Sequence, residues 1–264
     1  MKLKSILNYF AIIFLAVTTL SSCAYSRLIE CEAVDGRTDG NKNIVFENDT
    51  VKVEYNLWGE NGNMYFNVYN KLSVPLYVDW YKCAYIEGER KYDYTGVIKE
   101  RKTFIPPMTK VSNPVQYYLL GDVTTVYATS NASGSKVKIT GVDLRNDKNS
   151  TVEQVAKTYK KSGKEKVFSK SYTSATSPLN FRSFITVSTC ESADECTNGK
   201  NMLFIDNSFY VKKITEMKQK QFLGKGTKVK TVIRKGNKTV KGKNVTVYQY
   251  PYKSGNSFYI PLVF

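Results

Sequence analysis

The chain has 264 residues, a formal net charge of +16, 20 tyrosines and no histidine. The lack of histidine excludes Ser-His-Asp and Cys-His catalysis and histidine-containing zinc sites. We therefore expect a non-enzymatic binding or structural protein with no catalytic residue, metal or cofactor. Frequent tyrosine, threonine and valine favour strands over helices, so the sequence predicts a mostly β protein, and its length is enough for one large β domain or two small ones.

The first 22 residues have the features of a bacterial secretory signal peptide. Lys2 and Lys4 precede an apolar run at 9–17, which is far shorter than the roughly 20 residues that span a bilayer. The order Leu20-Ser21-Ser22-Cys23 resembles the lipobox of bacterial lipoproteins. That resemblance implies removal of residues 1–22 and fatty acylation of Cys23, so that acyl chains such as palmitate tether the mature protein to a membrane. The alternative is an ordinary signal peptide beside an incidental cysteine.

Positive charge is concentrated at the end of the chain. Without residues 1–22 the chain keeps 37 basic and 23 acidic residues, a charge of +14. Residues 24–150 hold 16 of each sign, whereas residues 208–264 hold 13 basic residues and one acid, Glu216. Such a one-sided field attracts acidic partners. We expect an anionic glycan, lipopolysaccharide or protein partner, and nucleic acid is a less favoured ligand.

Four further cysteines remain in a compartment that would be oxidising. They are Cys31, Cys83, Cys190 and Cys196. A disulfide between Cys190 and Cys196 would close a short polar loop, which leaves Cys31 to pair with Cys83, and this is the favoured pairing. A metal site built from four thiolates is the competing reading, but it lacks the Cys-x-x-Cys spacing of such sites.

The first predicted elements after Cys23 are a tether and then several short strands. Residues 23–43 are polar with two Asp-Gly turn signals and predict a lipidated N-terminus and tether. From residue 44 onward, alternating apolar residues predict strands at 51–55, 64–68 and 75–80. Short strands separated by turns about every ten residues are typical of an antiparallel sandwich.

Three residues in this part permit a functional reading as well as a structural one. Trp58 and Trp80 are either core residues or platforms for a sugar ring. Asp79 lies between apolar neighbours on a face shared with two tyrosines, where a carboxylate could bind a sugar or cation. A hydrogen-bonded strand aspartate and two core tryptophans are the favoured interpretation.

Several segments together look like a known group of proteins. Residues 70–80, Phe104-Ile-Pro-Pro-Met108, residues 177–188 and residues 206–211 resemble uncharacterised lipoproteins of Bacteroides-type bacteria. The similarity covers parts of 44–216. It implies an immunoglobulin-like β-sandwich on a lipid tether and supplies no activity. The basic segment 217–264 lies outside the resemblance.

The second half of the sandwich is interrupted by a polar excursion at 121–176. One strand is predicted at 136–142 within it, and residues 151–161 are read as a short helix or loop. Apolar patterns return at 181–187 and 202–214, which predict two strands joined by the Cys190/Cys196 loop.

The segment 217–264 predicts a basic β-hairpin appendage. Lysines alternate with Val229 and Thr231, turns are expected at Gly236-Asn237 and Gly242, and a further strand follows at 244–250. Lysines beside aromatic rings suit phosphate-rich or anionic polysaccharide ligands, although lysines also protect exposed strand edges from aggregation. The candidate binding residues are Lys228, Lys230, Arg234, Lys235, Lys238, Lys241, Lys243, Tyr248 and Tyr250.

Together these features predict a lipid-anchored cell-envelope protein that contacts an anionic component or a protein partner. Because Ala24, rather than aspartate, follows the cysteine, resemblance to well-studied lipoproteins favours the outer membrane, on its periplasmic face or at the cell surface. The alternatives are an accessory glycan-binding lipoprotein that uses a Trp/Tyr surface, and a hydrolase built on acids such as Glu87/Glu89 or Asp194/Glu195.

Overall fold

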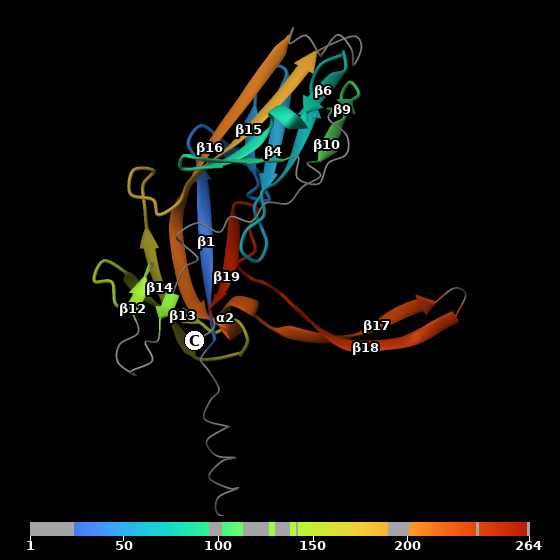
Figure 1. The fold of residues 1–264 in the computed structure, drawn as a ribbon. Coiled ribbons are helices and arrows are strands. Elements are labelled where there is room, and N and C mark those ends of the chain that lie inside the picture. The colour runs from blue at the N-terminus through green and yellow to red at the C-terminus, as the bar shows by residue number, and fades with distance from the viewer. Residues whose placement is uncertain are drawn as a thin grey trace, which may run out of the picture.

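The chain is mostly β in a computed structural model, and its antiparallel sheets curl into a half-barrel (Figure 1). The structure describes residues 24–94, 102–112, 127–129, 138–140, 142–189, 201–235 and 238–262, with the backbone alone at 127–129, 138–140, 232–235 and 238–243. Within these ranges no helix is both long and apolar enough to cross a membrane. The predicted fold class, mostly β with antiparallel sheets, is confirmed.

One long strand, β16 (Met202–Lys218), connects the two halves of the main sheet. Its first half pairs with β15 (Asn180–Thr189), and its second half lies between β1 (Tyr25–Ala33) and β14 (Lys164–Ser171). In Figure 1 β16 runs along the length of the body, with β15 beside its upper part and β1 beside its lower part. A single strand therefore holds the upper and lower parts in one sheet.

The other strands extend this sheet or form a second one. In the ten-stranded sheet, β6 and β7 pair with β15, β9 with β6, β8 with β7, β13 with β14 and β19 with β1. A five-stranded sheet has the order β10-β5-β4-β3-β2. The bounds are β2 Arg37–Thr38, β3 Ile44–Glu47, β4 Val51–Asn56, β5 Tyr65–Asn70, β6 Leu76–Asp79, η1 Trp80–Lys82, β7 Ala84–Glu87, β8 Arg90–Asp93, β9 Lys102–Ile105, β10 Lys110–Ser112, β11 Tyr127–Thr129, β12 Lys138–Thr140, β13 Thr151–Ala156 and β19 Ser257–Leu262.

The two sheets face each other across an aromatic core in the upper part. Tyr55 on β4 meets Phe209 on β16 edge to face at a centroid separation of 4.9 Å, and Phe209 stacks on Phe181 of β15 at 5.0 Å. The inward residues of the predicted strands, including Val53 and Val78, are fully buried. The predictions of strands near 51–55, 64–68, 75–80, 181–187 and 202–214 are confirmed, since strands lie at each of these places.

Two predictions about segments outside the expected sandwich are wrong. Residues 25–33, assigned to a tether, form β1 in the middle of the main sheet, where it is paired on both edges. Residues 151–156, read as helix or loop, form β13, which pairs with β14 on the edge of the same sheet. The expected strand near 136–142 is present as β12.

The predicted disulfide between Cys31 and Cys83 is also wrong, because both are free, buried thiols. Cys31 lies opposite Val211 of β16, whereas the Cys83 sulfur accepts the Thr186 N–H at 3.3 Å, and Thr186 lies opposite Phe204. The two positions on β16 are seven residues apart, roughly 23 Å along a strand. A disulfide tolerates a Cα separation of only about 7 Å. Cys190, Cys196 and the predicted lipidation site Cys23 lie outside the described residues.

The C-terminal segment begins inside β16, which continues through the expected boundary between 216 and 217. It then forms α2 (Gln219–Leu223), β17 (Gly226–Lys235) and β18 (Lys238–Tyr248), and returns as β19 in the main sheet. The turn expected at Gly242 is wrong, because β18 is continuous there. The register between β17 and β18 shifts at Lys230/Val232, so Gly242 lies in a β-bulge rather than a turn.

Candidate binding surface

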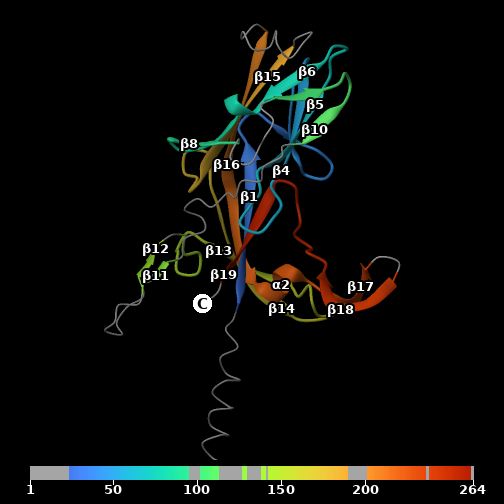
Figure 2. The ribbon, with the colours of Figure 1, turned by 45° about the vertical axis from the view of Figure 1, so that its right-hand side comes forward.

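The pair β17–β18 projects sideways from the lower end of the body, beside α2, in both Figure 1 and Figure 2. Its two ends are tied together at this base. The Tyr250 N–H donates to the Leu223 carbonyl at 3.1 Å, and Gly224 ends α2 with a φ of 70° that favours glycine. A Cβ on Gly224 would also lie 2.9 Å from Pro251. The hairpin therefore leaves the body from a defined turn.

Gln221 fixes the base to the lower sheet. Its side chain is fully buried in α2, and its amide donates to the Ala156 carbonyl and to the Tyr252 hydroxyl, each at 2.9 Å. Its amide oxygen accepts the Thr158 N–H at 3.0 Å. One side chain thus joins α2, the β13–β14 connection and the segment that follows the hairpin.

A small aromatic cluster fills the space around α2. Phe222 is buried and packs against Trp58, Tyr250 and Tyr259, with ring centroids 4.9–6.2 Å apart. Burial, with the neighbouring Tyr250 adding to it, raises the pKa of Tyr259 to about 12. These rings form a satellite core with Leu28 and Met217. Trp58 therefore has a packing role at the base of the hairpin, and Trp80 is fully buried in the main core.

The hairpin has two chemically different faces along its first half. The register places Lys228 opposite Thr246 and Lys230 opposite Asn244, which puts both lysines on one face. The other face carries Val229 opposite Val245 and Thr227 opposite Val247. The three valines are 44%, 45% and 54% exposed, so this apolar face is open rather than packed against the body.

Tyr248 completes the lysine face near the base. A Cβ on Gly226 would approach its ring at 3.1 Å and the Thr246 methyl at 2.7 Å, so the Tyr248 ring lies over the glycine backbone. The ring is 39% exposed. Placement of an aromatic ring across a strand glycine is a recognised way to stabilise a β-ribbon.

The positive charge of this region has no acidic counterpart on its own segment. Glu216 is the single acid after residue 207, and it is only 2% exposed. It pairs with Arg27 of β1 at 3.0 Å and with Arg145. Residues 217–264 contain no Asp or Glu at all. The exposed Lys228 and Lys230 therefore lie on a segment that carries other basic residues and no acid.

The structure brings the predicted binding residues together along one ribbon, with one exception. Lys228, Lys230 and Tyr248 are exposed, whereas Tyr250 is half-buried at the base, where it contacts Trp58. The remaining basic candidates lie on the outer half of the hairpin, where the backbone alone is described: Arg234, Lys235, Lys238, Lys241 and Lys243. No sequence signal marks the exposed valine face as a feature of its own, because Val229 is predicted only as part of the alternation.

The strand aspartate Asp79 is buried on β6, opposite Lys102 of β9. Glu87 accepts a hydrogen bond from the Tyr85 hydroxyl at 3.4 Å. Asp194 and Glu195 lie outside the described residues. No group of three or more metal-ligating side chains converges in the part of the chain that the structure describes.

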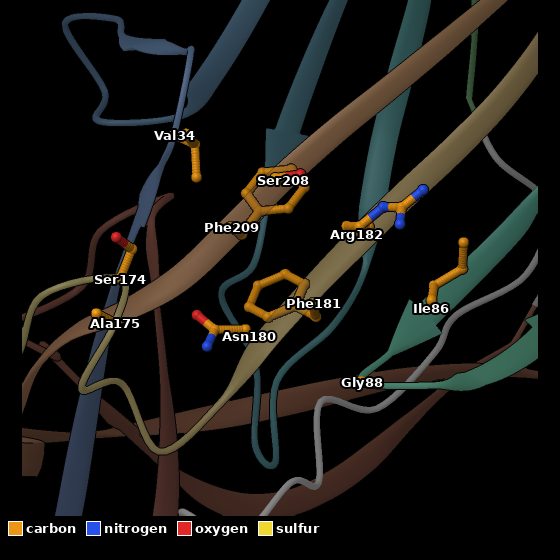
Figure 3. Close-up of a pocket in the computed structure, with 10 residues that line it drawn as sticks. All are labelled: Val34, Ile86, Gly88, Ser174, Ala175, Asn180, Phe181, Arg182, Ser208 and Phe209. Carbon is orange, nitrogen blue, oxygen red and sulfur yellow. The ribbon is translucent and has the colours of Figure 1, made fainter.

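Apart from the hairpin, the described residues form a pocket on β15 and β16. This pocket of about 360 Å³ is lined by Phe181, Phe209 and Val34, with the turn at Gly88 beside it (Figure 3). At its edge the Arg182 guanidinium donates to Asp206 at 2.6 Å and 3.0 Å. Its lining is mostly apolar, and none of the described lining residues is a carboxylate or a thiol. The pocket is therefore a mostly apolar recess whose polar lining includes the hydroxyls of Ser174 and Ser208.

Comparison with protein-family models, with curated proteins and with solved structures found no match for this chain.

Proposed function

We propose that the protein is a lipid-anchored component of a bacterial cell envelope that binds an anionic partner through the hairpin β17–β18. The observation that carries this proposal is the hairpin itself: a ribbon held on a fixed base, with exposed Lys228 and Lys230 and no acid on its segment. Charged surfaces of one sign concentrate partners of the opposite sign and speed their association. The rest of the chain serves as the body that positions this ribbon.

The anchor and the fold enter the same proposal. The lipobox-like order at residues 20–23 supports acylation of Cys23 and an outer-membrane location. Two antiparallel sheets that share one core support an immunoglobulin-like sandwich in the upper part, on which the basic hairpin is an appendage. No catalytic group is part of the proposal.

The proposal is tested with the chain beginning at Ala24, which includes every described element. We expect it to bind immobilised heparin or lipopolysaccharide at low salt and to elute as salt rises, because exposed charges are screened beyond about 10 Å at 0.1 M. Removal of residues 226–248, with Gly224 and Lys225 joined to Gln249, should abolish this binding. Binding that is insensitive to salt, or that survives the deletion, would mean that the hairpin is not the binding surface.

The anchor is tested separately on the protein isolated from its native cells. Mass spectrometry should find Cys23 as the first residue, with acyl chains attached. Protease treatment of intact cells then separates the two faces of the outer membrane, because only a surface-exposed chain is cleaved. An unmodified Cys23 would leave the hairpin as a binding surface but would remove the membrane from the proposal.

The alternative of a glycan-binding protein with a Trp/Tyr platform receives less support. Trp80 is fully buried, and Trp58 packs against Phe222 and Tyr259. A sugar-binding platform needs an open ring face. Trp80 supplies none, and Trp58 is only partly exposed and stacks on Phe222.

A further inference from the structure

The start of the described chain lies against the base of the hairpin. The Ala24 carbonyl accepts the N–H of Gln219, the first residue of α2, at 2.8 Å. The next residue, Tyr25, pairs with Lys218 on one side and Leu262 on the other. Cys23 is one residue further, about 3.8 Å between Cα atoms. An acyl anchor on Cys23 would therefore hold the hairpin base next to the membrane surface.

The orientation of the hairpin suits this position. In Figure 1 and Figure 2 β17 and β18 extend outward from the end of the body where β1 begins, not upward along the body. Ten residues of β17 reach roughly 33 Å. A ribbon with this origin and direction would run along a bilayer that holds Cys23 rather than away from it.

The two faces of the ribbon match the chemistry of a bilayer interface. Amphipathic elements that lie in the interface bury an apolar face about 5–10 Å into the headgroup and acyl boundary, while cations on the polar face meet anionic headgroups. Val229, Val245 and Val247 form such an apolar face, and Lys228 and Lys230 form the cationic one. A soluble polyanion would use the lysines alone and would give no role to the exposed valines.

We infer that the hairpin docks onto the anionic surface of the same bilayer that holds Cys23, with its valines at the acyl boundary and its lysines among the headgroup phosphates. This inference rests on the proposed lipid anchor and deepens the proposed function by naming the partner. The anchor makes docking intramolecular, so a weak intrinsic affinity is sufficient. Acyl chains and hairpin then act as two attachment points that fix the orientation of the body.

The experiment measures co-sedimentation of the chain beginning at Ala24 with vesicles of phosphatidylglycerol mixed with phosphatidylcholine, and with phosphatidylcholine alone. The chain should bind the anionic vesicles. Lys228→Gln/Lys230→Gln should weaken this binding roughly 25-fold, at about fivefold for each lysine near the surface. Val245→Asn and Val247→Asn, made separately, should each weaken it roughly tenfold, because each removes a valine side chain that would be buried at the acyl boundary and leaves the net charge unchanged.

Matched controls on the upper part of the body separate docking from general charge or hydrophobicity. Arg90→Gln/Lys110→Gln removes two exposed cations on β8 and β10, and Val74→Asn changes a valine that is 49% exposed. These controls should leave vesicle binding unchanged. All variants should keep the melting temperature of the parent chain, which identifies any variant that has lost its fold.

Heparin binding, measured in parallel, distinguishes failure of the inference from failure of the proposed function. The lysine variant should weaken both ligands, whereas the valine variants should weaken vesicle binding alone. If the valine variants bind vesicles like the parent while heparin binding depends on the lysines, the bilayer is not the partner and the anionic binding surface stands. If the parent chain binds neither ligand, or if no hairpin variant changes binding, both the inference and the proposed surface are overturned.

Discussion

The upper body and the hairpin β17–β18 use the same kinds of residue in opposite ways. In the body, Val53 and Val78 alternate with polar residues and are fully buried between two sheets. In the hairpin, Val229 and Val247 alternate with lysine and threonine, yet they are about half exposed because no second layer covers them. Period-two alternation thus produces a core when two sheets meet, and an open amphipathic ribbon when a strand pair stands alone.

The largest expected difference between the two regions is in thiol reactivity. Burial raises the pKa of Cys83 to about 12, so near pH 8 its thiolate fraction is far smaller than that of an exposed thiol, whose pKa is about 8.5. Cys83 should therefore resist iodoacetamide in the folded chain and react fully once the chain is unfolded without reductant. A cysteine placed in the hairpin by Val247→Cys should react at an ordinary rate. If Cys83 failed to react after unfolding, its sulfur would be bonded in a disulfide, contrary to the free thiol in the structure.

The next largest expected effect is the loss in free energy of unfolding when a buried, rather than an exposed, aromatic ring is removed. Phe209 is 1% exposed and contacts Phe181 and Tyr55, so Phe209→Ala should lower the free energy of unfolding by about 3–5 kcal/mol. Phe204 lies on the outer face of the same strand, is 57% exposed and stacks on Phe184. Phe204→Ala should cost less than about 1.5 kcal/mol. Urea denaturation of both variants measures the contrast, and equal losses would mean that the sheets do not share a core at Phe209.

The buried charges give a smaller effect in the lower part. Glu216 lies 2% exposed between Arg27 and Arg145, so Glu216→Gln leaves buried guanidinium charge without its carboxylate and should cost about 3 kcal/mol. Asp206→Asn breaks the more exposed pair with Arg182 and should cost less than about 1 kcal/mol. The same denaturation measurement compares them. A loss for Glu216→Gln no larger than that for Asp206→Asn would contradict the burial of this ion pair.

The ion pair also shows why part of the fold could not be read from the sequence. The strands β4 and β5 were predictable because Val53, Tyr55 and Phe66 alternate with polar residues and face one core. β1 was not, because it buries Ser26 and Arg27 as well as Leu28 and Ile29. Arg27 is tolerated there through Glu216, which is 189 residues away in the chain. A buried charge whose partner is so distant leaves no local pattern.

The candidate binding surface also has one part that the sequence predicts and another part that it does not. Alternating lysines and turn residues predict a basic ribbon in this segment, and the structure pairs β17 with β18 in antiparallel register, with a bulge at Gly242 where a turn was predicted. Its base could not be predicted, because Gln221 and Phe222 acquire their roles from Thr158, Trp58 and Tyr259, which tertiary folding brings to α2. The alternation of residues along the chain predicts strands in this segment, whereas long-range packing determines the direction in which the strand pair leaves the body.

The base of the hairpin should respond to a single polar substitution. Gln221→Ala removes a fully buried side chain together with its hydrogen bonds to the Ala156 carbonyl and the Thr158 N–H, and should cost about 2 kcal/mol. Gln154 is exposed on β13, so Gln154→Ala is the matched control and should be nearly neutral. Hydrogen exchange should locate the change, with faster exchange of the Tyr250 N–H in Gln221→Ala. Unchanged exchange there would mean that Gln221 does not hold the hairpin base.

The smallest effect is expected in the hairpin itself. Val247→Ala should change the free energy of unfolding by no more than about 0.5 kcal/mol, because the side chain is already 54% exposed. Val53→Ala removes the same two carbons from a fully buried valine and should cost at least about 1.5 kcal/mol. If Val247→Ala destabilised the chain as much as Val53→Ala, the ribbon would be packed against the body in solution. Its valines would then belong to a core, and no open apolar face would remain to meet a membrane.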